Sequence, residues 1–151
     1  MAIAVSKPAI LTLVLGLAVA AAPVRSQEQA QPSLSIDLNA LEQVGPACRL
    51  VFVATNKTDA AIDELSLETV LFNSSGTVDR FALFDFQALP YGKTRVRQFD
   101  LPDISCDDIG RVLINGAASC KGQSLNGQSL KGPECVDLLE LKSSSKTEIV
   151  G

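Results

Sequence analysis

The sequence contains no histidine among its 151 residues. This absence excludes enzymes that activate a serine or cysteine nucleophile with an imidazole, and it excludes metal centres with histidine ligands. The four cysteines do not supply a metal site either, because no two of them have the CxxC spacing. We therefore expect neither a cofactor nor a zinc centre.

Positive charge is also scarce, since 13 lysines and arginines stand against 17 acidic residues. Removal of residues 1–26 would take away Lys7 and Arg25 and no acid, leaving a mature net charge of −6. An acidic domain repels the phosphate backbone of nucleic acids and anionic lipid surfaces. We expect no nucleic-acid partner and no stable membrane anchor after cleavage.

The chain has no apolar run of the ~20 residues that span a bilayer. Its apolar run at residues 9–22 follows Lys7 and precedes small residues, an order typical of a secretory signal peptide cleaved after Ala20 or Ser26. The predicted organisation is a signal peptide at 1–26, a disordered linker at 27–32 and a folded domain at 33–151. No twin arginine precedes the run, which favours Sec-type export to the periplasm or the exterior.

The folded part consists of short runs with period-two alternation, separated by turn signals every 8–12 residues or so. This pattern predicts an all-β, immunoglobulin-like or fibronectin III-like antiparallel sandwich of about seven strands. The expected strands cover 34–38, 48–54, 65–72, 78–86, 94–101 and 109–117, with a last strand or strand pair from 136–141 and 147–150. A helical turn is expected at 39–45 and a flexible loop at 122–132.

The even number of cysteines in a small exported domain indicates two disulfides. If the second strand pairs with the one at 94–101, Cys48 and Cys106 meet at one end of the sandwich. Cys106 and Cys120 flank a single extended strand, which holds them far beyond the ~4.4–6.8 Å Cα separation of a disulfide. The predicted bonds are Cys48–Cys106 and Cys120–Cys135.

Residues 48–101 resemble the general plan of FxLYD-type immunoglobulin-like domains. A resemblance that covers most of the mature chain is to small exported proteins of α-proteobacteria labelled "Tat pathway signal sequence domain protein". The residues that carry it are 48–53, 83–90, 95–102 and 110–116. The resemblance implies a periplasmic location and no defined activity.

Arg95 and Arg97 alternate along one strand, close in sequence to Tyr91. They could form a cationic face for an anionic ligand or an acidic partner. The alternative is an edge strand protected by its charges, or salt bridges to Asp85 and neighbouring acids.

Acidic residues crowd the loop from Asp100 to Asp108. Asp103, Asp107 and Asp108 offer oxygen ligands for calcium, although without EF-hand spacing. The alternative is a set of solvated acids. A hydrolase that uses carboxylates alone is a third hypothesis.

The strand at 78–86 carries apolar side chains on both faces, at Phe81, Leu83, Phe84 and Phe86. A central strand would bury both faces, whereas an edge strand would expose one face as a contact surface. The leading interpretation of the whole chain is a non-catalytic periplasmic sandwich that binds another protein or an envelope component. Ligand or calcium binding is the alternative.

Overall fold

The computed structural model describes residues 31–151. The predicted signal peptide and residues 27–30 of the expected linker lie outside the described residues. Residues 31–33 precede the first strand without regular secondary structure. No helix within residues 31–151 is long and apolar enough to cross a bilayer.

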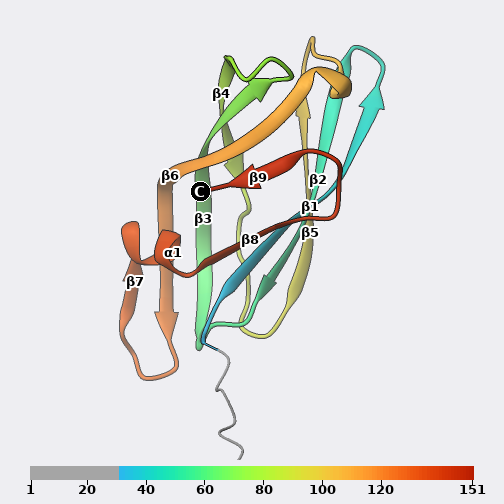
Figure 1. Ribbon diagram of the computed structural model, residues 1–151. Coiled ribbons are helices and arrows are strands. Elements are labelled where there is room, and N and C mark those ends of the chain that lie inside the picture. Colours follow the sequence, from blue (N-terminus) through green and yellow to red (C-terminus); the bar gives the residue numbers. More distant parts are fainter. Residues whose placement is uncertain (1–30) are drawn as a thin grey trace, which may run out of the picture. The chain divides into compact units, whose positions relative to one another are not determined.

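The described part is built almost entirely of strands, which confirms the all-β prediction (Figure 1). It has nine strands where about seven were expected. The strands are β1 (Leu34–Val44), β2 (Ala47–Asn56), β3 (Ala60–Asn73), β4 (Val78–Asp85), β5 (Thr94–Leu101), β6 (Ile109–Ser124), β7 (Ser129–Lys131), β8 (Leu139–Ser143) and β9 (Glu148–Val150). A 3-10 helix, η1 (Cys106–Asp108), precedes β6, and a short helix, α1 (Pro133–Asp137), precedes β8.

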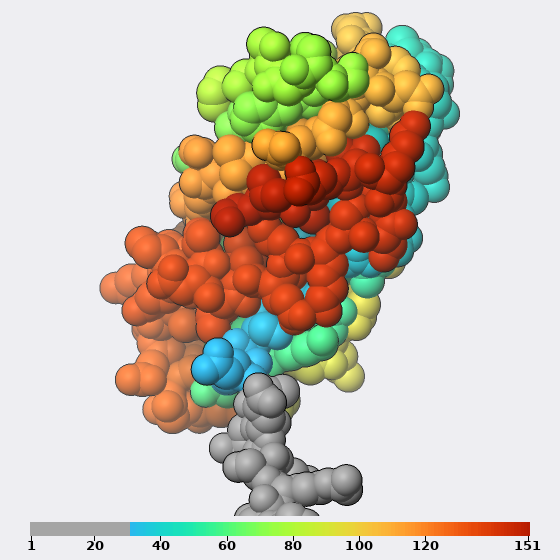
Figure 2. Space-filling view, viewed as in Figure 1, coloured from blue at the N-terminus to red at the C-terminus, as the bar shows by residue number. Residues whose placement is uncertain are grey.

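The strands form two sheets that pack as a sandwich. Sheet A has the order β5-β2-β1-β8, and sheet B has the order β4-β3-β6-β7 with β9 beside β6. The predicted antiparallel pairing of β2 with β5 is confirmed. The expectation of antiparallel pairing throughout is wrong, because β8 runs parallel to β1 and β9 parallel to β6. The C-terminal segment adds one strand to each sheet. Its residues lie together on one face of the molecule (red in Figure 2).

The core between the sheets holds the inward-facing aliphatic residues of β1, β2, β3 and β6, together with a phenylalanine cluster. Phe84 of β4 stacks on Phe99 of β5 with ring centroids 4.5 Å apart. Phe52 of β2 meets Phe86 edge-on at 5.4 Å. These contacts place β4 and β5, the edge strands of the two sheets, on the same side of the sandwich.

Both predicted disulfides are confirmed. Cys48 at the start of β2 is bonded to Cys106 of η1, with Cα atoms 5.0 Å apart. Cys120 of β6 is bonded to Cys135 with Cα atoms 6.4 Å apart, although Cys135 lies in α1 and not at the start of a strand as expected. Two disulfides in a domain of this size are typical of an oxidising, extracytoplasmic environment.

Three local predictions are wrong. The expected helical turn at 39–45 is strand, because β1 continues through a bulge at Leu38–Ala40 and pairs with β2 up to a hairpin at Gly45. The expected loop at 122–132 is a hairpin in which β6 pairs with β7, and its turn is held by the Ser124 hydroxyl, which accepts from the Gln128 N–H at 3.0 Å. The expected strand at 136–141 begins as helix because Pro133 starts α1.

Candidate functional site

Arg97 holds the two edge strands together. Its side chain lies on the inner face of β5, where Nε donates to the Phe86 carbonyl at 2.7 Å and Nη2 to the Ala88 carbonyl at 3.2 Å. Both acceptors belong to the segment that leaves β4 in the other sheet. The guanidinium of Arg97 is therefore used as a structural link between the sheets.

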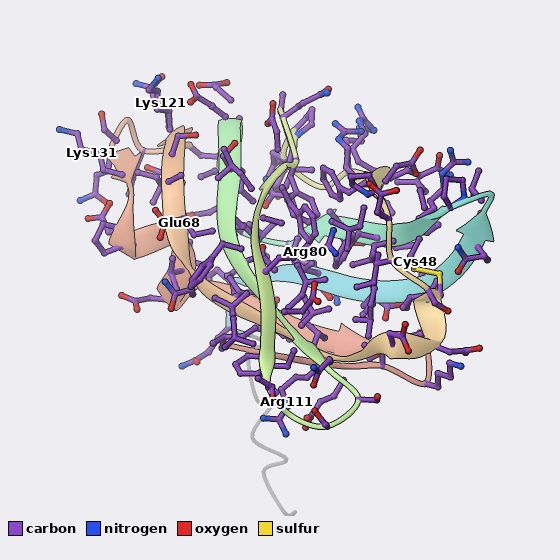
Figure 3. All side chains as sticks on the ribbon, turned by 90° about the horizontal axis from the view of Figure 1, so that it is seen from above. Cys48, Glu68, Arg80, Arg111, Lys121 and Lys131 are labelled. Atoms are coloured by element: carbon purple, nitrogen blue, oxygen red, sulfur yellow. A yellow bond between two sulfur atoms is a disulfide. The ribbon has the colours of Figure 1, made fainter. Side chains whose placement is uncertain are left out.

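Arg80, labelled in Figure 3, makes the corresponding contact from β4. Its Nη1 donates to the carbonyl of Pro102 at 2.7 Å, just after β5 ends. Its Nε pairs with the carboxylate of Asp79 at 2.5 Å. Arg80 and Arg97 thus close the β4–β5 side of the sandwich from opposite sheets.

The predicted cationic face is not assembled around Arg95 and Tyr91. Arg95 donates to the carbonyl of its neighbour Thr94 at 3.0 Å, and Tyr91 lies in the turn before β5 with half of its surface exposed. Within residues 31–151 no hydrogen bond joins Tyr91 to Arg95 or Arg97, and no ion pair joins either arginine to Asp85. Strand β5 does lie at the edge of sheet A, as the alternative supposed, and it carries both arginines.

Two acids of the 100–108 loop are engaged by cations. Asp100 accepts two hydrogen bonds from Arg49, at 2.7 and 2.9 Å, and this contact lowers the pKa of the Asp100 carboxyl. Asp107 forms an ion pair with Lys146, whose hydrogen bond lowers the pKa of Asp107. These carboxylates are therefore satisfied by side chains of the protein itself.

A cleft of about 710 Å³ lies beside this loop and is bounded by acids, by Arg80 and by Lys146. The calcium ligands predicted there, Asp103, Asp107 and Asp108, do not converge. Within residues 31–151 no group of three or more acidic or cysteine side chains is arranged to hold a metal ion. The geometry gives the calcium hypothesis no support.

Strand β4 exposes a row of large apolar side chains. It is the outermost strand of sheet B. Its side chains alternate between the two faces of the sheet, so that Phe84 and Phe86 enter the core while Phe81 and Leu83 lie on the outer face. The exposed fraction of Phe81 is 76% and that of Leu83 is 59%. Of the two readings of this sequence, the edge strand with an exposed apolar face is the one that the structure supports.

The apolar face continues into the neighbouring strands, where Val70 is buried and Leu113 half-buried beside the exposed Phe81. Phe81 lies opposite Val70 of β3, which in turn lies opposite Leu113 of β6, and directly opposed residues share a face of a sheet. We call these three residues with Leu83 the β4 patch. Leu83 lies opposite Glu68, labelled in Figure 3, which places a carboxylate beside the apolar row.

A shallow hollow of about 340 Å³ is lined by Phe81, Leu83 and Glu68 together with Thr69, Ala82 and Asn115. Glu68 and Asn115 were not singled out from the sequence. Asn115 lines the hollow because a bulge between Glu68 and Thr69 leaves it without a direct partner on β3. No local sequence signal marks that bulge.

The two edge strands on this side of the sandwich differ in how they are protected. Strand β5 turns Arg95 and Arg97 inwards and carries Gln98 and Asp100 on its outer face around Val96. Inward-pointing charges are a known protection against edge-to-edge pairing. Strand β4 turns a single charged residue, Arg80, inwards and has none between Phe81 and Phe84. The least protected edge of the two therefore coincides with the β4 patch.

Comparison with known proteins identifies the fold. No protein-family model matches the chain, and no curated relative does. The sandwich is similar to the structure of IrmA from Escherichia coli. The match has a TM-score of 0.54 and 15% identity, and it covers 74% of this chain and 92% of IrmA. A structural-genomics target, SoR45, matches with a TM-score of 0.32 and 8% identity. This match covers 67% of this chain and 78% of the SoR45 chain. The likeness to IrmA supports the sandwich fold alone.

Proposed function

We propose that the mature chain is a non-catalytic protein-binding module that works in the periplasm and uses the β4 patch as its contact surface. The observation that carries this proposal is the exposure of Phe81 and Leu83 on the outer face of an edge strand. An exposed apolar row rimmed by polar residues is typical of interaction surfaces. Aromatic side chains of this kind supply much of the binding energy in protein interfaces.

The location rests on two independent features of the chain. The apolar run at 9–22, preceded by Lys7, has the order of a Sec-type signal peptide. The two disulfides require a compartment in which they persist.

The non-catalytic role rests on the chemistry of the side chains. The sequence has no histidine, and every shift resolved for a carboxyl pKa within residues 31–151 is downward. A carboxylate-only hydrolase needs a general acid whose pKa is raised. Hydrogen bonds from neighbouring cations and hydroxyls lower the pKa of the carboxyls of Glu64, Asp100, Asp107 and Glu140.

A photo-crosslinking amino acid at position 83 tests the proposal in cells. Val96 is a matched control position, because it is 55% exposed and lies on the outer face of the edge strand β5. We expect one discrete crosslinked product from position 83, absent from position 96 and lost when Phe81→Ser is added. Equal products from both positions, or none from position 83, would contradict the proposal.

A further inference from the structure

The main-chain groups of β4 alternate between a bonded and an open side. The Phe86 N–H donates to the Leu65 carbonyl at 2.8 Å, and at the other end of the hairpin the Asn73 N–H donates to the Thr77 carbonyl at 2.8 Å. The main-chain N–H and C=O groups of odd-numbered residues of β3 therefore point towards β4. Between Leu71 and Leu67 of β3 their partners in β4 are the even-numbered residues Arg80, Ala82 and Phe84. The N–H and C=O groups of Phe81 and Leu83 point to the open edge.

The outer face of β4 carries an acidic residue at one end of its apolar pair. Phe81, Leu83 and Asp85 alternate along the strand, whereas Asp79 is the extra residue of a bulge between Val78 and Arg80 and lines the cleft beside the 100–108 loop together with Arg80. Within residues 31–151 neither Asp85 nor Glu68 forms an ion pair, while Asp79 is paired with Arg80. The rim of the β4 patch is thus negatively charged.

Resting on the proposed function, we infer that β4 binds an extended segment of a partner protein as an additional strand of sheet B. Main-chain hydrogen bonds to Phe81 and Leu83 provide the affinity, as in other cases of strand addition. Specificity comes from alternate side chains of the partner, two apolar residues followed by a basic residue beside Asp85 and Glu68. A segment with a basic residue at each end brings one of them to these acids in either strand direction.

A second copy of this chain fits the edge less well. In an antiparallel β4–β4 pair with Phe81 opposite Leu83, each copy brings Asp85 on its outer row and no basic side chain. The acids beside Leu83 would then gain no cation from the second copy. The net charge of −6 on each mature copy adds further repulsion.

The test uses the oxidised protein and the probe acetyl-Lys-Thr-Val-Thr-Ile-Thr-Lys-amide, whose outer row is basic, apolar, apolar, basic. The matched control probe has Glu in place of both Lys. We expect the Lys probe to bind at least tenfold more tightly, as measured by isothermal titration calorimetry. With the Lys probe at saturation, amide hydrogen exchange of Phe81 and Leu83 should slow at least tenfold, whereas that of Ala82, already bonded to β3, should change little.

Three outcomes would overturn the inference. Absence of binding by the Lys probe excludes the predicted chemistry. Binding that leaves the exchange of Phe81 and Leu83 unchanged shows contact with the β4 patch without strand addition, and the proposed function then stands. Slowing of the same two amides with rising protein concentration and no probe identifies a second copy as the occupant.

Discussion

The side-chain amide of Asn56 donates a hydrogen bond of 2.7 Å to the main-chain carbonyl of Leu89. A second bond from the same nitrogen reaches the Ala60 carbonyl at 2.8 Å, and its Oδ1 accepts from the Thr58 N–H at 3.0 Å. One fully buried amide therefore ties the end of β2 to the start of β3 and to the turn before β5.

Replacing Asn56 should be strongly destabilising. Asn56→Ala removes two buried hydrogen bonds to the Leu89 and Ala60 carbonyls and leaves the buried Thr58 N–H without its acceptor, so we expect the free energy of unfolding to fall by about 2–3 kcal/mol. Asn56→Asp should cost more, because a carboxylate oxygen would face both carbonyls. Urea denaturation measures both losses. Asn39→Ala is the control, because the Asn39 amide is exposed and its one side-chain hydrogen bond, to Asp37, is long at 3.5 Å. This substitution should change the free energy of unfolding by less than about 0.5 kcal/mol.

Arg97 links the two sheets, whereas Arg95 bonds only within its own strand. Arg97→Met removes the bonds to Phe86 and Ala88, and we expect a loss of about 1–2 kcal/mol in thermal or urea unfolding. Arg95→Met removes only a bond to Thr94 and should cost less than about 0.5 kcal/mol. Equal losses for the two variants would show that Arg97 does not link the sheets.

The two disulfides should contribute unequally to stability. The chain-entropy relation gives about 4 kcal/mol for Cys48–Cys106, which closes 58 residues, and about 3 kcal/mol for Cys120–Cys135, which closes 15. Double substitution of each pair by alanine, followed by urea denaturation, measures the two terms. A larger loss from the shorter loop would contradict the expected order.

Stability should be insensitive to pH near neutrality and fall in acid. The protein has no histidine to titrate between pH 5 and 8. Asp100 and Asp107 have lowered pKa values because of Arg49 and Lys146, so their stabilisation is complete above the unfolded pKa and is lost as the pH falls below about 4. Melting temperatures from pH 3 to 8 test this, and Arg49→Met should make the acid limb shallower. A steep change between pH 6 and 7 would contradict it.

Two glycines of β6 should respond oppositely to alanine. A Cβ at Gly110 would lie 2.6 Å from the main-chain oxygen of Asn73, so Gly110→Ala should cost about 1–3 kcal/mol. At Gly116 the nearest atom is a carboxylate oxygen of Glu68 at 3.6 Å. Gly116→Ala should therefore be neutral or slightly stabilising. Thermal unfolding of the two variants makes the comparison, and similar melting temperatures would contradict it.

Features that depend on local alternation could be predicted from the sequence. The pairing of β2 with β5 and the Cys48–Cys106 bond followed from strand patterns and the reach of an extended chain. The segment 39–45 was predicted wrongly because its residues favour a helical turn, whereas pairing with β2 across the Gly45 hairpin holds it extended. Local propensity does not contain that tertiary pairing.

The β4 patch could be predicted only as one of two alternatives. Phe81 and Phe84 have the same hydrophobic character and lie on opposite faces of β4, and the face that packs on Phe52 and Phe99 of sheet A is the one that is buried. The role of Arg97 as a link between the sheets could not be predicted from the sequence either, because the carbonyls of Phe86 and Ala88 that accept its hydrogen bonds follow a strand of the opposite sheet. Both features depend on where separate strands lie in space.

The parallel pairing of β1 with β8 has a consequence for the order of folding. Leu34 lies opposite Leu139, so β1 can pair with β8, its second neighbour in sheet A, only after almost the whole chain has been made. A chain that emerges with its N-terminus first carries Leu34, Ile36 and Leu38 on a strand with one open edge during most of its emergence. Completion of sheet A is therefore a late event, and products that stop before residue 139 should be open to proteolysis along β1.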